Sequence, residues 1–334
     1  MQFNLSSLRQ SFHAARAMAR HAMPAGAWLS RDEAIMGTAI RVELWSEDSD
    51  QGEAAIDAVM AEMHRIDRTM SPHKPESELS VINRDAASRA VPLSDEMARL
   101  IARAIEFSQL SSGAFDITYA SVGHLYDYRR GVRPSDAALQ QAREAVGSRF
   151  LQLDARARTI RFSRNGVRID LGGFAKGHAV DNSIAILRQH DIQHAIVSAG
   201  GDSRVLGDRR GRPWTIAIRD PRRAAEVVAV LPLEDVSIST SGDYERFFEQ
   251  AGVRYHHLID PATGRSPDGV RSVTILANDG LTSEALSKTV FVLGAQHGLE
   301  LISKLADVDA VIVDAAGALH FSSGLLAGTT PVRQ

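Results

Sequence analysis

The sequence predicts an α+β protein whose strands run through both halves of the chain. From Gly37 to Trp45, apolar and charged residues alternate, which is the period of a half-buried strand. Between Ala54 and Met70, apolar residues recur every three or four positions, which is the period of an amphipathic helix. After Asp170, helical and strand-like stretches follow each other without an internal repeat. Helices and strands mixed in this way favour the α+β class.

Two further helices in the first half are indicated by residues that cap helix N-termini. Ser94 precedes two acidic residues, so its hydroxyl can accept a hydrogen bond from a free amide of the first turn. The acidic side chains then face the positive end of the helix dipole. Ser135 opens a shorter helix, which we expect to continue to Val146. The basic stretch from Arg129 to Arg133 between these two helices is expected to be a surface loop.

The second half is expected to alternate between helices and short strands. Helices are predicted at 178–190, 282–293 and 296–305, with Gly294 ending the second of them. Strands are predicted at 195–198, 214–218, 227–233, 236–240 and 273–276, followed by a closing hairpin at 310–313 and 318–321.

The composition is that of a globular chain with a full core. Of its 334 residues, 44% are hydrophobic and 24% are charged. The net charge of −3 argues against a general nucleic-acid binder, which would carry a basic excess. Because cysteine is absent, disulfides, thiolate metal sites and a cysteine nucleophile are excluded. No run of about 18 apolar residues occurs, so no membrane span is expected.

We expect residues 1–30 to form a poorly ordered N-terminal extension and residues 31–330 to form a single domain. The basic residues of the first 30 positions are dispersed, and the apolar core of a signal peptide is missing. A basic amphipathic helix at 11–23 is the alternative for this extension.

The stretch from Arg168 to Gly201 carries the strongest chemical signal. It reads R-I-D-L-G-G-F-A-K-G-H-A-V-D and later S-A-G-G, so two glycine turns, an acid and Lys176 share one apolar region. Glycine leaves backbone N–H groups open to a ligand, and lysine supplies positive charge, a combination that suits an oxyanion. The alternative is a purely structural pair of turns, because glycine commonly marks turns.

Seven short motifs, in order, resemble those of one known family. They are M-G-T at 36–38, M-S-P-H-K-P-E-S-E-L-S at 70–80, G-A-F-D at 113–116, D-L-G-G-F-A-K-G at 170–177, S-T-S-G-D-Y-E-R at 239–246, H-L-I-D-P-A-T-G-R at 257–265 and T-S-E-A-L-S-K-T-V-F-V-L-G at 282–294. Their order and spacing resemble the ApbE-type flavin transferases, which are FAD:protein FMN transferases. The resemblance covers residues 34–325 and is far more specific than any one motif.

The resemblance implies an ApbE-like, T-fold-related architecture of mixed sheets with flanking helices. It implies an FAD site and a divalent cation, usually Mg²⁺. In the implied reaction the FAD diphosphate is cleaved, and FMN is joined by a phosphoester to a Thr or Ser hydroxyl of an acceptor flavoprotein. A diphosphate must have its charge neutralised before a hydroxyl can attack it. Some members of the family only hydrolyse FAD to FMN and AMP, and others only bind FAD.

The resemblance also implies roles for residues at matching positions. The cation would be held by the backbone carbonyl of Gly173 and by the side chains at positions 284 and 288. The catalytic set would be His257, as a proton-transfer or phosphate group, with Glu284 and Lys288. The residues expected to contact FAD are Met36, His73, Ala114, Phe115, Asp116, Asp170, Lys176 and Ile259. Structural alternatives stay open for three of the residues in these sets: Met36 as a core residue, His73 as a surface residue and His257 as a structural histidine.

Three positions depart from the family's pattern. Glu284 replaces the usual Asp but keeps a carboxylate, and His73 replaces an aromatic residue but can still stack on a flavin. Lys288 replaces the usual Thr, and a protonated lysine has three donors and no acceptor, so it cannot ligate a cation. Either its ammonium takes the place of the cation beside the diphosphate, or it pairs with Glu284 and weakens the site. A solvated surface pair is the third alternative.

Three functions are therefore compared. The first is transfer of FMN to an acceptor protein, the second is FAD binding by a degenerate site, and the third is metal-independent FAD hydrolysis. If the protein is active, we expect it to need Mg²⁺ less than its relatives do. Although many relatives are exported, the missing signal and lipidation cysteine favour the cytoplasm, with the periplasm as the alternative.

Overall fold

The computed structural model describes residues 26–223 and 225–327. The expected disorder of residues 1–25 and the alternative helix at 11–23 fall outside the described residues. Strand β1 (Ala27–Ile35) begins within the predicted extension and pairs with β2 (Thr38–Ser46) along its whole length. Residues 27–30 therefore belong to the folded domain. Three consecutive charged residues, at 31–33, interrupt the alternation that would have revealed this strand.

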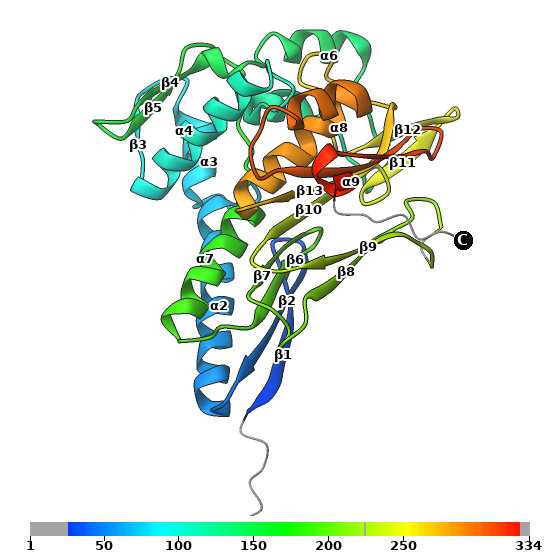
Figure 1. Cartoon of the computed structure of the whole chain (residues 1–334). Helices are drawn as coiled ribbons and strands as arrows, with labels where there is room; N and C mark the ends of the chain where they lie inside the picture. Colours follow the sequence, from blue (N-terminus) through cyan, green and yellow to red (C-terminus); the bar gives the residue numbers. More distant parts are fainter. Residues whose placement is uncertain (1–25, 224, 328–334) are drawn as a thin grey trace, which may run out of the picture.

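An antiparallel eight-stranded sheet forms the centre of the described fold (Figure 1). Its strand order is β1-β2-β6-β7-β10-β13-β14-β15. The later strands are β6 (Ala195–Ala199), β7 (Asp202–Leu206), β10 (Ser237–Gly242), β13 (Val270–Ala277), β14 (Asp309–Asp314) and β15 (Leu319–Phe321). The predicted strands of the second half and the closing hairpin are thus confirmed, because β14 and β15 pair directly.

Three long helices pack against the sheet: α2 (Ser49–Met70), α7 (Ala175–Gln189) and α8 (Gly280–Ile302). Helix α7 also packs against both α2 and α8. The alternation of β6 shows that both sheet faces are covered. Ala195 and Val197 belong to the main core, whereas Ile196 packs into a second cluster on the opposite face. Gly294 has a φ of 80° and separates α8 into two helical segments, as its position in the sequence predicts.

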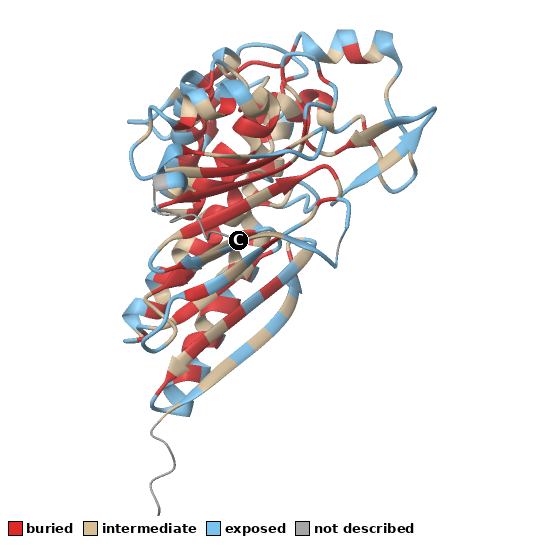
Figure 2. Cartoon of the chain, turned by 45° about the vertical axis from the view of Figure 1, so that its right-hand side comes forward, coloured by how far each residue is buried: buried red, intermediate tan, exposed pale blue. Residues whose placement is uncertain are grey.

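A ribbon of two strands, β8 (Trp214–Arg219) and β9 (Val227–Leu233), covers this opposite face. The remaining strand pair, β11 (Phe247–Gln250) and β12 (Val253–His256), forms a hairpin that the sequence analysis missed. Figure 2 shows the central strands largely buried and the projecting hairpins largely exposed.

The upper part of the fold in Figure 1 contains shorter elements and a three-stranded sheet. These are α3 (Glu78–Asp85), β3 (Val91–Pro92), α4 (Asp95–Leu110), η1 (Ile117–Tyr119), α5 (Ala120–Gly123), α6 (Asp136–Arg143), η2 (Ser148–Phe150), β4 (Leu151–Asp154) and β5 (Thr159–Phe162); α9 (Ser323–Ala327) follows β15. Ser94 and Ser135 cap α4 and α6 as predicted, but α6 ends before Val146. The stretch at 129–133 is a largely exposed loop, as expected.

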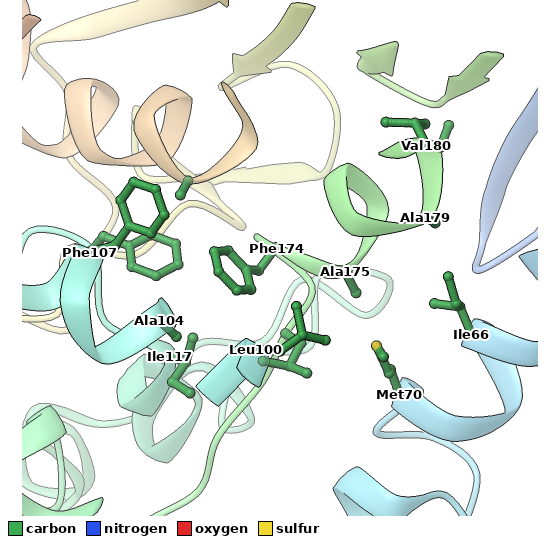
Figure 3. Packing of buried hydrophobic residues seen from close by; sticks show 14 of the residues in the cluster. Ile66, Met70, Leu100, Ala104, Phe107, Ile117, Phe174, Ala175, Ala179 and Val180 are labelled. Carbon is green, nitrogen blue, oxygen red and sulfur yellow. The ribbon is translucent and has the colours of Figure 1, made fainter. Parts of the chain in front are cut away.

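Three aromatic rings join the upper part to the main core. Phe107 of α4, Phe115 and Phe174 lie with their ring centroids 5.7 to 6.0 Å apart. Figure 3 shows Phe174 directed toward Phe107, with Ala175 at the start of α7 beside it. This packing stabilises the turn from which α7 begins. Within the described residues, no helix has the length and apolar character needed to cross a membrane.

Candidate active site

A pocket of about 180 Å³ brings the two glycine turns together. Gly172 and Gly173 line it from the turn before α7, and Gly200 and Gly201 line it from the turn between β6 and β7. Gly200 has a φ of +63°, and a Cβ atom there would lie 2.5 Å from Thr38 Oγ1. Only glycine fits such a turn without strain, so the backbone stays open to a ligand.

A second close approach positions the pocket's charged residues. A Cβ atom on Gly177 would clash with the backbone of Gly280, so these two glycines allow the first turns of α7 and α8 to touch. This contact places Lys176 beside Glu284, and the Gly177 N–H donates to Glu284 Oε2 at 2.7 Å.

Four charged side chains meet at the floor of the pocket. The Lys176 ammonium donates to Asp202 Oδ2 and, at 2.5 Å, to Glu284 Oε1. Lys288 Nζ lies 3.1 Å from Glu284 Oε1 and 3.9 Å from Asp202 Oδ1. We call Lys176, Asp202, Glu284 and Lys288 the charge cluster. With two ammonium groups and two carboxylates, it is close to neutral.

Burial and mutual attraction set the protonation of this cluster. Burial alone would raise the pKa of Asp202, but Lys176 and Lys288 outweigh it and hold that pKa below its usual value. Burial would likewise lower the pKa of Lys176, but Asp202 and Glu284 raise it above its usual value. Both groups are therefore charged at neutral pH.

The exposed fractions of these side chains exclude the solvated surface pair. Lys288 is 18% exposed and Glu284 is fully buried. The side-chain carbons of Lys288 also lie against Gly173, since a Cβ atom on that residue would be 3.7 Å from them. Gly173, Glu284 and Lys288, which we expected to hold a cation, are therefore together, but as part of an ion-pair cluster.

The residues present do not fit a divalent cation. Glu284 Oε1 already faces two ammonium groups, and Oε2 accepts from the Gly177 amide. In the part of the chain that the structure describes, no three His, Cys, Asp or Glu side chains form a possible metal site. Mg²⁺ needs oxygen ligands in octahedral geometry, and a lysine ammonium offers none.

His257 lines the same pocket, and its Nδ1 atom is buried without a hydrogen-bond partner in the described structure. Burial, assisted by the positive charge of Arg246, lowers the pKa of His257 to about 3. The imidazole is therefore neutral at physiological pH, and its low pKa makes it a weak base in these surroundings. Arg246 itself lines the pocket and donates to Gly37 O in the β1–β2 turn.

Ala114, Phe115 and Asp116, which we expected to contact FAD, also line the pocket. The carboxylate of Asp116 already accepts from the amides of Thr118 and Ser148 at 2.8 and 2.7 Å. The Asp116 carboxylate therefore stabilises its own loop, so the backbone and the neighbouring side chains are the groups that can contact a ligand.

Asp170 and Ile259 line the pocket as well. Asp170 Oδ1 accepts from the Gly172 amide, which stabilises the first glycine turn. Burial raises the pKa of Asp170, although that hydrogen bond opposes the shift.

The structure does not place His73 and Met36, two of the residues expected to contact FAD, in the pocket wall. His73 is exposed and lies near Asp170, where it opposes the rise that burial causes in the pKa of that carboxyl. Met36 lies in the β1–β2 turn with a φ of 53° and packs against the main core. Met36 is near the rim, since Thr38 at the start of β2 lines the pocket.

Sequence reasoning missed Asp202, which directly follows the second glycine turn. It is 3% exposed and accepts from Ser239 Oγ at 2.5 Å as well as from Lys176. Its position one residue after Gly201 was the available signal, because a strand that begins at such a turn projects its first side chain near the turn. Tyr119 and Arg246 were also missed. Arg246 ends the motif at 239–246, which was an available signal, whereas nothing in the spacing of Tyr119 pointed to the pocket.

Known proteins resemble this chain over most of its length. The model of the ApbE family matches residues 36–312. The chain belongs to the ApbE family. It is similar to the FAD:protein FMN transferase of Treponema pallidum, with 31% identity over 316 residues that cover 89% of this chain and 87% of that protein. The corresponding protein of Haemophilus influenzae is 32% identical over 282 residues, covering 80% and 82%.

Solved structures of ApbE proteins share this fold. The crystal structure of the ApbE protein from Thermotoga maritima has a TM-score of 0.85 at 32% identity, covering 91% of this chain and 100% of that one. The flavin transferase ApbE from Vibrio cholerae has a TM-score of 0.79 at 28% identity, covering 90% and 99%. The expected family and the α+β class are thereby confirmed.

Proposed function

We propose that this protein is an FAD:protein FMN transferase, which passes FMN from FAD to a Thr or Ser hydroxyl of an acceptor flavoprotein. The observation that carries this function is the pocket in which two lysine ammonium groups and two glycine turns converge. The diphosphate of FAD would lie against these groups, because backbone amides and ammonium groups are the donors that phosphate oxygens need.

The transfer requires three events that this pocket can support. The acceptor hydroxyl oxygen attacks the phosphorus of the FMN half, the bond between that phosphorus and the bridging oxygen breaks, and AMP leaves. Lys176 and Lys288 offset the charge that develops on the phosphate oxygens. Neutral His257 can accept the hydroxyl proton, and the incoming diphosphate would raise its low pKa toward neutrality.

Mg²⁺, which the family resemblance implied, is not needed to describe these steps. The Lys288 ammonium occupies the space between Glu284 and Asp202 that a cation would require. We therefore propose that the lysines supply the positive charge and that the reaction does not depend on Mg²⁺.

The near-neutral charge cluster favours one alternative, an FAD-binding protein that turns over slowly or not at all. The two carboxylates already pair with both lysines, so less positive charge is left for the diphosphate. Metal-independent FAD hydrolysis would be the outcome if water replaced the acceptor hydroxyl.

A two-part assay tests the proposed function. Titration with FAD, followed by flavin fluorescence, should show saturable binding in EDTA. Incubation with FAD and threonine-containing peptides, followed by mass spectrometry, should reveal an FMN adduct. Saturable binding without adduct would favour the FAD-binding alternative, and release of FMN and AMP alone would indicate hydrolysis. The absence of saturable binding in any ionic condition would overturn all three.

A further inference from the structure

A second pocket of about 140 Å³ adjoins the first, with which it shares Gly201, Thr240 and Glu245. It lies between the central sheet, represented by Ser203 and Ile238, and strand β8 of the covering ribbon. A polypeptide placed in this second pocket would therefore lie beside the wall that the two pockets share, where Gly201 directly precedes Asp202 of the charge cluster.

Strand β8 presents its edge to this pocket. Four consecutive residues, 216–219, line it, whereas side chains on one face of a strand occur only at alternate positions. In the described part of the chain, β8 pairs only with β9. The edge of β8 that faces the pocket thus carries N–H and C=O groups without a strand partner, which is the feature that binds an extended peptide as an added strand.

We infer that the acceptor polypeptide docks in an extended conformation along the free edge of β8, with its Thr or Ser at the junction of the two pockets. This inference rests on the proposed function, because only group transfer to a protein requires a polypeptide site next to the FAD pocket. Main-chain hydrogen bonds to β8 would hold the segment, and the hydroxyl would face the diphosphate beside Lys176.

The shared wall is narrow because of Gly201. A Cβ atom on this residue would lie 2.5 Å from the carbonyl oxygen of Thr240, whose own amide donates to Gly201 O at 2.8 Å. The two backbones therefore approach closely, and Gly201 places no side chain between the pockets at this point.

Two tryptophan variants of β8 test the docking site. Ala217 and Thr215 are both exposed and lie two positions apart on the same side of β8, but only Ala217 lines the second pocket. Each of Ala217→Trp and Thr215→Trp is titrated with FAD and then incubated with FAD and a library of synthetic twelve-residue peptides that each contain one central threonine.

We expect Ala217→Trp to bind FAD like the wild type. Its rate of FMN adduct formation should be about one tenth of the wild-type rate or lower. Thr215→Trp should match the wild type in both measurements. If Ala217→Trp formed adducts at the wild-type rate, the proposed docking site would be overturned. Loss of FAD binding by the wild-type protein would instead overturn the proposed function, so the two failures are distinguishable.

A second measurement addresses the main-chain hydrogen bonds. The best peptide from the library is resynthesised with N-methyl groups on alternate amides, in two complementary sets. If the peptide adds as a strand, one set should abolish modification and the other should leave it nearly unchanged, because only one edge of the peptide faces β8. Equal modification of both sets would contradict the inference.

Discussion

Replacing Lys288 by threonine should convert FAD binding from metal-independent to metal-dependent. The substitution removes an ammonium that lies 3.1 Å from Glu284 Oε1 and 3.9 Å from Asp202 Oδ1. At an effective dielectric constant of about 20, these attractions correspond to roughly 5 and 4 kcal/mol before desolvation is subtracted. The charge cluster would then carry a net negative charge and repel the diphosphate.

The size of the effect on FAD follows from the loss of one charged contact. Such a contact contributes about 1.5–3 kcal/mol, which corresponds to a roughly 10- to 100-fold weaker affinity for FAD. In EDTA, Lys288→Thr should show this loss. With Mg²⁺ added, its hydroxyl and the two carboxylates, which then face only the Lys176 ammonium, can act as hard oxygen ligands, so the affinity should recover.

The assay is a fluorescence titration with FAD in EDTA and in Mg²⁺, with two control variants. Lys288→Met removes the charge without offering a ligand, so its affinity should fall and stay low in Mg²⁺. Lys304→Thr removes an exposed lysine that does not line the pocket, so it should resemble the wild type. Wild-type FAD binding that requires Mg²⁺, or unchanged affinity of Lys288→Thr in EDTA, would refute the reasoning.

Three further substitutions probe the charge cluster, the histidine and the helix contact. Asp202→Asn leaves buried Lys176 with one carboxylate fewer and should lower the free energy of unfolding in urea by about 3 kcal/mol; a loss below about 1 kcal/mol would contradict the pairing. The pKa of His257 is about 3 in the folded protein and near 6.5 in the unfolded chain. Between pH 6.5 and pH 3 the unfolded chain therefore binds one proton more, so the free energy of unfolding falls as the pH falls. Between pH 6 and 4.5 the wild type should lose about 1 kcal/mol more per pH unit than His257→Gln, and parallel curves would refute the low pKa. Gly177→Ala should cost about 1–3 kcal/mol of unfolding free energy by forcing α7 away from Gly280, whereas an unchanged denaturation midpoint would show that the helices can separate freely.

The sequence by itself determined the strands and helices whose periods are regular. Alternation in β2 and the apolar stripe of α2 depend only on which face is buried, and capping by Ser94 depends only on local backbone amides. The seven motifs also determined the family, because their order along the chain needs no contact information. Strand β1 was missed because its charged residues interrupt the strand period. The strand is stabilised by pairing with β2, which lies farther along the chain.

The tertiary structure alone decided what the site residues do together. Lys288 was compatible with three arrangements in the sequence, and only its burial and its distances to Glu284 and Asp202 select the ion-pair cluster. Asp202 joins that cluster because sheet pairing and the α7–α8 contact bring residues from three separate segments to one point. Electrostatic interactions depend on distance and burial rather than on sequence order, so no spacing along the chain could have revealed them.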